Sequence, residues 1–380
     1  MTIFVGCGFA AKYLHGGGNF SVPLQWMLGL RRLKRDAIWL EHMPSEGNPR
    51  EDQRKIDNFQ RQLRAHGLGG RYCLLYHEKP ESAHDLDTLR CVGMSKRELL
   101  DRLAGPNTIL NLSYSIHPPL LMKFERRIFC DLDPSEIMFW MTKMELGQST
   151  HHEFWTIGLN VNAADCGLPK SNVKWRAFFP LVDTKLYRPK PRPRWPKFTT
   201  IGQWYWDGAV EVDGDYPDLS KKHAFEKYLD LPKRVGEARF ELAMHMSPKD
   251  PELQRVRKRG WQIVEPHKLA RTPKRYRQYL AGALGEFTAI KGVDVTWRTG
   301  WLSDRAAAFL ATGRPVITED SGAGKYLPPE SGFHFVADLE QSVTAVEEVL
   351  ANWSRRSRQA RACAVEVFDS AKNLTKILSA

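Results

Sequence analysis

Short apolar runs alternate with amphipathic segments along most of this chain, and this alternation limits the possible folds more than any other feature. The opening run TIFVGCG ends in glycine, SVPLQWMLGLRRLKRD has the apolar spacing of a helix, and AIWLEHM is a second apolar run. Strand, glycine-bearing turn, helix and strand make a βαβ unit. Such a unit requires a parallel sheet, which binds its ligands at the carboxyl ends of the strands.

The alternation continues through both halves of the chain. After a helix from about Arg50 to His66, the first half predicts strands at YCLLYHE, TILNLSY and RIFCDLDP and a helix at SKRELLDRLA. The second half predicts strands at ARFELAMHM, GWQIVEP and RPVITED, a buried strand or turn at GEFTAIKG, helices at PKRYRQYLAGA and SDRAAAFLATG, and a helical tail from about Leu339 to Ser379. The fold class is therefore α/β.

A proline-rich stretch, YRPKPRPRWPKFTT, separates the two halves. Prolines at alternate positions cannot join a central sheet, and they favour an extended, stiff connector. A chain of 380 residues also exceeds the roughly 100–200 residues of one ordinary domain. We therefore expect one domain over residues 1–185, a linker over 186–198, a second domain over 199–352 and a C-terminal helix over 353–380.

The composition is that of a folded protein, with 42% hydrophobic and 26% charged residues. No run reaches the roughly 18–20 apolar residues of a membrane span, and the start lacks the basic flank of a secretion signal, so we expect a cytoplasmic protein. The six cysteines form no CxxC pair, which favours reduced thiols over disulfides or a zinc site. We therefore expect no metal.

One segment, RTGWLSDRAAAFLATGRPVITEDSG, carries the strongest functional signal. The loop of Thr299, Gly300 and Trp301 precedes a helix of small residues that Ser303 or Asp304 could cap. Unpaired N–H groups and the positive end of the helix dipole at such a place favour a diphosphate. Gly313 fits the helix C-cap, and Pro315 ends the helix before the next strand.

This segment resembles the donor-binding region of GT-B glycosyltransferases, in which Glu-Gly-Phe-Gly is followed by Glu-Ala-Met-Ala-x-Gly-x-Pro-Val. Matching positions are Gly300, Trp301, Ala311, Gly313, Pro315 and Val316. In looser form, the glycine-rich start and the later segments look like bacterial and phage-associated glycosyltransferase-like proteins. The resemblance implies two Rossmann-like domains facing across a cleft, with the C-terminal helix packing back toward the N-terminal domain. It also implies a nucleotide-diphosphate sugar, a UDP-sugar above others, as co-substrate, with no tightly bound cofactor.

The sequence departs from the family pattern at two positions. Thr299 stands where the family has a sugar-contacting Glu, and Ala308 stands where it has the ribose-binding Glu. Because Asp304 lies one turn before Ala308 on the same helix face, we expect Asp304 to bind the ribose hydroxyls. Arg305 and Lys291 are the candidates for the diphosphate, since a departing nucleoside diphosphate needs fixed positive charge. The loop that follows the next strand should meet the donor sugar; it contains Glu319, Asp320, Ser321 and Gly322.

The N-terminal half supplies candidates for the other side of the cleft. Gly16, Gly17 and Gly18 allow the backbone to approach a ligand closely, and the resemblance assigns them to the cleft. An inverting reaction needs a catalytic base, whereas a retaining reaction needs none. The options for the base are His15, His117, Asp131 and Asp133.

Basic residues exceed acidic ones by 12, which favours an acidic partner. Basic and aromatic residues interleave at Lys174–Arg176, along the linker with Tyr187 and Trp195, and in QRVRKRGW. Because cations contact phosphates and aromatic rings stack on bases, this mixture suits nucleic acid. A hydroxymethylated base in phage DNA is therefore the preferred acceptor. A small-molecule, glycan or lipid-linked acceptor is the alternative.

Two readings compete with a transferase. The two missing glutamates suggest a non-catalytic nucleic-acid-binding protein with a degenerate glycosyltransferase fold. GCGFAA imitates the start of a dinucleotide motif at Gly6, Gly8 and Ala11, as in a nicotinamide dehydrogenase or an epimerase, but the insert KYLHGGGN spoils its turn.

Overall fold

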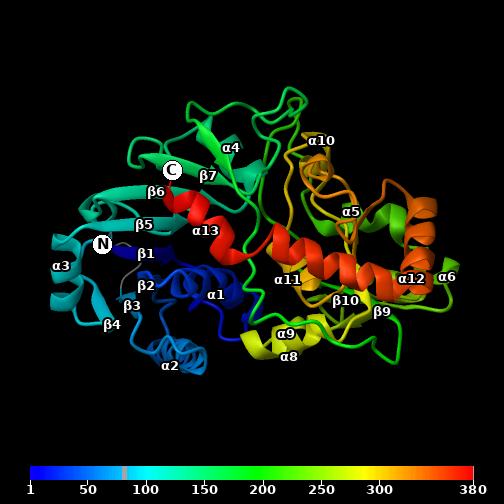
Figure 1. The fold of residues 1–380 in the computed structure, drawn as a ribbon, viewed down its shortest axis with the longest axis horizontal. Coiled ribbons are helices and arrows are strands. Elements are labelled where there is room, and N and C mark those ends of the chain that lie inside the picture. Colours follow the sequence, from blue (N-terminus) through cyan, green and yellow to red (C-terminus); the bar gives the residue numbers. More distant parts are fainter. Residues whose placement is uncertain (79–83, 380) are drawn as a thin grey trace.

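The computed structural model describes residues 1–78 and 84–379 and contains two α/β domains side by side (Figure 1). Within these residues the first domain has one eight-stranded sheet with the order β4-β3-β2-β1-β5-β6-β7-β8. Neighbouring strands are parallel, except that β4 runs antiparallel to β3. The strands are β1 (Thr2–Cys7), β2 (Asp36–Pro44), β3 (Tyr72–His77), β4 (Arg90–Gly93), β5 (Asn107–Leu112), β6 (Arg126–Asp131), β7 (Glu153–Thr156) and β8 (Trp175–Ala177).

Helices cover both faces of this sheet, as a parallel sheet requires. They are α1 (Gly17–Arg32), α2 (Pro49–Ala65), α3 (Lys96–Ala104) and α4 (Pro134–Met141), with a 3-10 turn at Leu120–Lys123. Side chains alternate between the faces along each strand. In β1, Ile3 and Val5 pack with α1 and α2, whereas Phe4 packs with Leu99 of α3.

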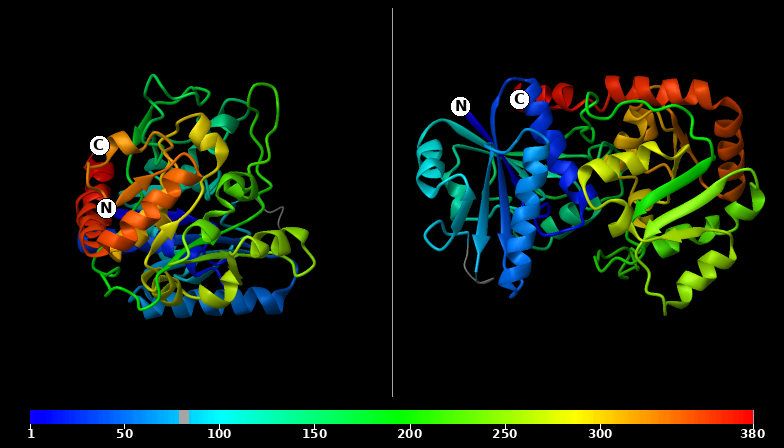
Figure 2. Two further views of the ribbon diagram at one scale, coloured as in Figure 1. Left: turned by 90° about the vertical axis from the view of Figure 1, so that its right-hand side faces the viewer. Right: turned by 90° about the horizontal axis from the view of Figure 1, so that it is seen from below.

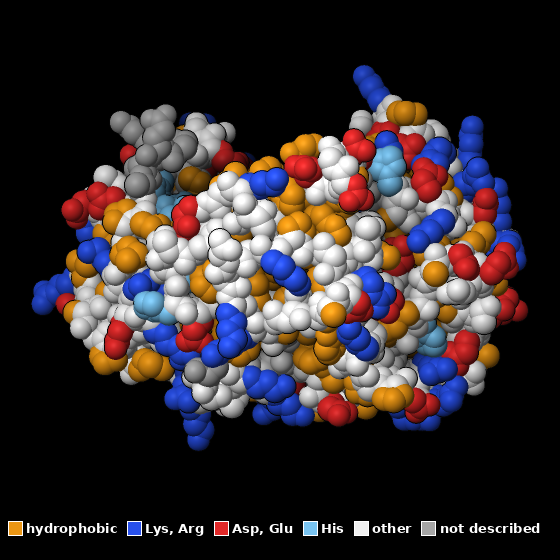
Figure 3. All heavy atoms as spheres, turned by 90° about the horizontal axis from the view of Figure 1, so that it is seen from above, with side chains coloured by type: hydrophobic (Ala, Val, Ile, Leu, Met, Phe, Trp, Pro, Cys, Tyr) orange, Lys and Arg blue, Asp and Glu red, His pale blue; other side chains and the backbone are white. Residues whose placement is uncertain are grey.

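The second domain has a six-stranded parallel sheet with the order β11-β10-β9-β12-β13-β14. The strands are β9 (Lys197–Gly202), β10 (Arg239–Met244), β11 (Gln262–Val264), β12 (Gly285–Phe287), β13 (Val316–Thr318) and β14 (Phe333–Phe335). Helices are α5 (Lys221–Phe225), α6 (Leu231–Arg234), α7 (Pro251–Lys258), α8 (Pro266–Leu269), α9 (Pro273–Ala281), α10 (Gly292–Thr296) and α11 (Asp304–Ala311), with 3-10 turns at Glu226–Tyr228 and Gly324–Tyr326. The two domains form two lobes with a notch between them along one edge (Figure 3).

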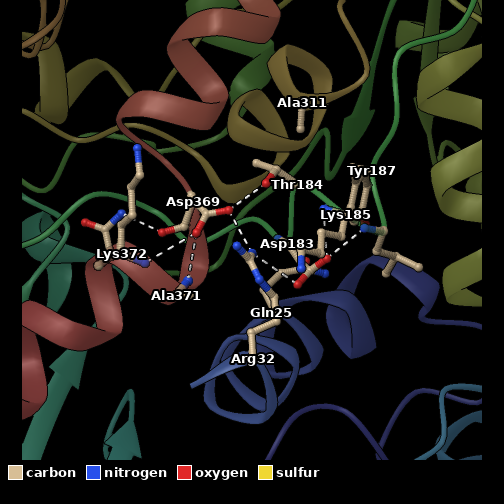
Figure 4. A network of polar contacts seen from close by, with 12 residues as sticks. Gln25, Arg32, Asp183, Thr184, Lys185, Tyr187, Ala311, Asp369, Ala371 and Lys372 are labelled. Atoms are coloured by element: carbon tan, nitrogen blue, oxygen red, sulfur yellow. Dashed lines mark hydrogen bonds and ion pairs between the residues drawn. The ribbon is translucent and has the colours of Figure 1, made fainter. Parts of the chain in front are cut away.

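The C-terminal helices cross from the second domain back to the first, as expected (Figure 2). Helix α12 (Leu339–Glu366) has non-helical backbone angles at Asn352, and α13 (Ser370–Ser379) packs on α1, where Leu374 and Ile377 join the first core. A polar network fixes the junction between them (Figure 4). Asp369 Oδ2 accepts from Arg32 Nη1 of α1 at 2.7 Å and from Thr184 Oγ1 at 2.6 Å. The end of the chain therefore ties both domains together.

Sequence reasoning missed several short elements. Strands β4, β7 and β8 have only three or four residues, too few to show a period. Strand β9 begins at Lys197, inside the expected linker of residues 186–198, because the prolines end at Pro196. The expected domain boundaries otherwise stay predictions.

Candidate active site

A pocket of about 470 Å³ lies between the two domains. It is bordered by the carboxyl ends of β9 and β10 and by the helix that follows β11, which is where parallel sheets bind ligands. From the first domain, the loop after β1 and the start of α1 form the opposite wall. The lining residues are Tyr13, His15, Gly16, Gly17, Gly18, Asn19, Ile201, Gly202, Gln203, Trp204, Tyr205, His245, Pro266, His267, Ala270, Tyr276 and Arg305.

The glycine run forms the first turn of α1 and not a loop. Gly17 N donates to Ala270 O at 2.8 Å, and a Cβ on Gly17 would lie 2.3 Å from that oxygen. A Cβ on Gly18 would lie 3.4 Å from the Tyr276 ring. The predicted close approach is therefore made to the backbone of the other domain, beside the pocket.

A buried carboxylate holds the loop that carries His15. Glu41 of β2 is fully buried, and its Oε1 accepts from the amides of Ala10 and Ala11 at 2.8 and 2.7 Å. Its Oε2 accepts from Trp39 Nε1 at 2.8 Å. Burial raises the pKa of Glu41 to about 7, although these donors lower it. Glu41 is a positioning residue that sequence reasoning missed, since it lies inside a strand with no motif.

Arg305 forms the floor of the pocket in front of β9 and β12. Its Nε pairs with the fully buried Glu286, Nη1 donates to Ile201 O at 2.9 Å, and Nη2 donates to Thr288 Oγ1 at 3.2 Å. These bonds fix the plane of the guanidinium group. The structure thus places this predicted diphosphate residue at the pocket with a rigid orientation.

A second cation, Lys221 of α5, lies beside Arg305, although it is not among the described residues that line the pocket. A Cβ on Gly202 would lie 3.6 Å from Lys221 Cε and 3.9 Å from Arg305 Nη1, so both side chains meet at the end of β9. The Lys221 ammonium donates to the Ala289 carbonyl and has no ion pair in the described part of the chain. Burial and the charge of Arg305 lower the pKa of Lys221 to about 7.

Sequence reasoning missed Lys221. Its segment, LSKKHAF, carries no glycine or periodic signal, and β9 begins within the stretch assigned to the linker. The available signal was a lysine that follows β9, the strand that comes first in the sequence of the second domain.

The predicted donor loop does not offer free amides, which corrects the expectation for this segment. Thr299 N donates to Asp294 O at 3.2 Å, Gly300 N to Ser321 O at 2.8 Å, and Trp301 N to Thr299 Oγ1 at 3.3 Å. The carbonyls of Thr299 and Gly300 accept from Asn160 and Leu159 of the first domain. The loop holds the domains together here, and its contact with a donor stays a prediction.

The start of α11 follows this loop. Ser303 caps the helix, since its Oγ accepts from Ala306 N at 3.0 Å. Burial raises the pKa of Asp304 to about 6. Among the described residues, Arg305 lines the pocket and its neighbour Asp304 does not. Its ribose-binding role stays a prediction.

The loop after β13 supports its neighbours in this structure. Glu319 Oε2 accepts from Ile290 N at 3.0 Å, and Asp320 Oδ1 accepts from Gly322 N at 2.9 Å. Ser321 Oγ donates to Trp301 O at 2.7 Å. None of these loop residues lines the pocket in the described chain, so their contact with a donor sugar also stays a prediction.

Lys291 lies across the domain interface from α4. Its Nζ is 2.6 Å from Asp133 Oδ2 and also pairs with Glu136. The Trp206 ring covers the ammonium at 4.7 Å from its centroid. Because two carboxylates already neutralise Lys291, it has less charge to offer a diphosphate than Lys221 has.

The four candidate bases lie in different surroundings. His15 lines the pocket, and burial and the charge of Arg271 lower its pKa. Asp131 is fully buried, accepts from Thr156 Oγ1 at 2.6 Å, and has a pKa raised to about 7 by burial. His117 stacks on His84 at 4.7 Å away from the pocket, and Asp133 pairs with Lys291. Of the four, the structure brings only His15 to the described pocket.

Most aromatic residues of the basic segments cannot stack on a base. Tyr187, Trp175 and Trp261 are 1%, 6% and 2% exposed, so the expectation that these rings stack on a base is wrong. Trp195 is the exception, with 57% of its surface exposed. The described residues contain no cluster of metal-ligating side chains and no helix with the length and hydropathy of a membrane span.

Neither a protein-family model nor a curated protein matches the chain in sequence. Solved structures match over its whole length. An alpha-glucosyltransferase with UDP and a 13-mer DNA containing an A:G mismatch aligns with a TM-score of 0.60 at 11% identity, over 100% of this chain and 99% of that one. The same transferase with UDP and DNA containing an HMU base gives 0.58 at 11%, over 100% and 98%. Anabaena HepE with UDP and glucose gives 0.58 at 10%, over 100% of both chains. The chain therefore has the GT-B fold of these structures, two Rossmann-like domains facing across a cleft.

Proposed function

We propose that this chain is a glycosyltransferase that takes its sugar from a nucleotide-diphosphate sugar, a UDP-sugar above others. The pair formed by Arg305 and Lys221 carries the proposal, because Lys221 is a half-buried cation that forms no ion pair with a carboxylate in the described chain. A diphosphate at the end of β9 would supply the missing negative charge. Fixed cations there would also stabilise the charge that grows on a departing nucleoside diphosphate.

Two further observations support this proposal. The pocket has the roughly 300–1,000 Å³ of a typical ligand site, and its wall joins both domains. The GT-B neighbours above are solved with UDP. Asp304 remains the proposed ribose residue and His15 the proposed base if the reaction inverts. We expect neither a metal nor a tightly bound cofactor.

For the acceptor we propose a hydroxyl group, and specifically that of a hydroxymethylated base in DNA. The excess of 12 positive charges supports a polyanionic acceptor, and the alpha-glucosyltransferase neighbours hold UDP together with DNA. A small-molecule or glycan acceptor is the alternative. Non-catalytic nucleic-acid binding is an alternative function, in which no nucleotide sugar would occupy the donor pocket.

Calorimetric titration with UDP, GDP, ADP and dTDP tests the donor, with Lys221→Met as the pocket variant and Lys222→Met as the matched control. We expect UDP to bind and only Lys221→Met to lose it. Incubation with UDP-sugars and hydroxymethylcytosine DNA, followed by mass spectrometry of the nucleosides, tests the acceptor. A protein that binds DNA but none of the four nucleotides would contradict a transferase.

A further inference from the structure

The proline-rich linker is fixed to the second domain. Arg314, 1% exposed, lies beneath it and donates from Nη1 to Lys190 O and from Nη2 to Pro191 O, both at 3.0 Å. Its Nε and Nη2 also donate to Ala281 O. From above the linker, Arg192 Nη2 donates to Leu350 O of α12 at 3.2 Å. The linker is therefore a rigid, extended segment on the face of the C-terminal helices (Figure 2).

Holding the linker through Arg314 is energetically unfavourable, because a charged side chain is buried there. All its hydrogen bonds in the described chain go to backbone carbonyls and none to a carboxylate, and burial lowers its pKa to about 10. The Trp353 ring lies 5.3 Å from the guanidinium carbon. A connector that only joined two domains would not need a buried cation, which suggests that the geometry of the linker itself matters.

The fixed linker presents cations at regular intervals. Arg188, Lys190, Arg192 and Arg194 occupy alternate positions, are exposed, and form no ion pair in the described residues. Pro189, Pro191 and Pro193 stand between them and favour an extended backbone. The linker thus offers these cations to the phosphates of a bound strand.

An exposed aromatic ring ends this row. Trp195 is flanked by the guanidinium groups of Arg194 and Arg239, whose carbons lie 5.1 and 5.3 Å from its ring centroid. Some exposed cations elsewhere are paired instead, as Arg255 is with Glu226 at 2.6 Å. Lys and Arg side chains gather along the lower edge of the outline, the face of α12 and α13 (Figure 3).

We propose that the linker is a preformed binding surface for single-stranded nucleic acid, with its row of cations on the phosphates and Trp195 stacked on a base. Phosphate neutralisation and stacking on an aromatic ring are the two terms that bind single strands. Arg314 lowers the cost of binding by holding the row in place beforehand. Among the described residues, none of the linker lines the donor pocket. The binding surface is therefore separate from that pocket, and the proposal does not depend on sugar transfer.

Fluorescence anisotropy with a labelled single-stranded oligonucleotide tests the proposal at several salt concentrations. We expect Lys190→Ala with Arg194→Ala to lower the affinity about tenfold and to reduce the salt slope by about 1.4, since each phosphate contact contributes about 0.7. The matched control, Arg257→Ala with Lys258→Ala, removes the same charge from α7 and should leave the affinity within about twofold. Trp195→Ala should weaken single-strand binding more than duplex binding.

Arg314→Met separates geometry from charge, because it frees the linker without removing an exposed cation. We expect about a fivefold loss of oligonucleotide affinity. UDP binding, measured on each variant, reports an intact fold and stays unchanged, so a failure here leaves the transferase proposal standing. An equal loss of oligonucleotide affinity in the α7 control, or no loss in the linker variant, would contradict the proposed binding surface. Binding to phosphatidylserine vesicles but not to the oligonucleotide would overturn it in favour of a membrane contact.

Discussion

Replacing Lys221 with methionine should make the free protein more stable and abolish UDP binding. Burial and Arg305 lower the pKa of Lys221 to about 7, so the folded state disfavours its charge. Each pKa unit corresponds to about 1.4 kcal/mol, and the side chain keeps some contact with solvent, so we expect a gain of about 2 kcal/mol near pH 7. Methionine keeps the length of the side chain and removes the charge.

The sign of the pH dependence follows from the same pKa. At pH 7 about half of the free protein carries a neutral Lys221, and a bound diphosphate would raise the pKa above that of the free protein. UDP affinity should therefore be greatest below pH 7 and fall as the pH rises. If the pKa in the complex is about 10, the fall between pH 7 and pH 9 is about 50-fold.

Calorimetry in two buffers with different ionisation enthalpies measures the proton uptake directly. Wild type should take up about half a proton per UDP at pH 7 and nearly one at pH 8. Lys222→Met should behave as wild type, whereas Lys221→Met should give no binding heat in either buffer. Tight UDP binding by Lys221→Met, or a lower free energy of unfolding in urea, would refute this account of the pocket.

Other parts of the structure give further expected outcomes. Gly17→Ala should cost about 1–3 kcal/mol in urea unfolding, because its Cβ would lie 2.3 Å from the Ala270 carbonyl oxygen, whereas Gly18→Ala should cost less. Burial and neighbouring histidines lower the pKa of His42 to about 4 and that of His84 to about 3. The unfolded state thus binds more protons below pH 6.5, and unfolding monitored between pH 7 and pH 5 should reveal a loss of about 2 kcal/mol for each histidine. Arg32→Met should cost about 3 kcal/mol in thermal unfolding, because it deprives the buried Asp369 of its 2.7 Å ion pair; a smaller effect than that of Arg54→Met would contradict this.

The fold was largely predictable because its elements repeat a simple pattern. Apolar runs such as those of β1, β2 and β6 are buried on both faces, so they stand out between amphipathic helices. Strand β9 did not stand out, because its first residue follows a run of prolines directly. A sequence pattern thus predicts long buried elements and fails where a strand adjoins an irregular segment.

The site was only partly predictable, since its polar groups meet across long sequence separations. Gly17 and Arg305 were found from local patterns, a glycine run and a basic residue at a helix start. Lys221 and Glu41 act through positions that only the folded sheets bring together. The Thr299–Trp301 loop matched a family pattern, yet its amides bond within the protein, because the pattern does not specify which carbonyls lie opposite.

The two domains contribute different things to the pocket, and this division explains why one cation is left unpaired. The first domain offers the backbone at Gly17 and the ring of His15, while its buried carboxylate Glu41 is turned inward to the amides of its own loop. The second domain offers the cations of Arg305 and Lys221, and its fully buried Glu286 pairs with Arg305. Lys221 has no ion pair in the described residues, and Glu286 and Glu319 offset only part of the effect of its burial, so a ligand that brings negative charge would stabilise it. The same imbalance that weakens the free protein would make the pocket selective for an anion, because a neutral molecule of equal size leaves Lys221 half-buried and without an ion pair.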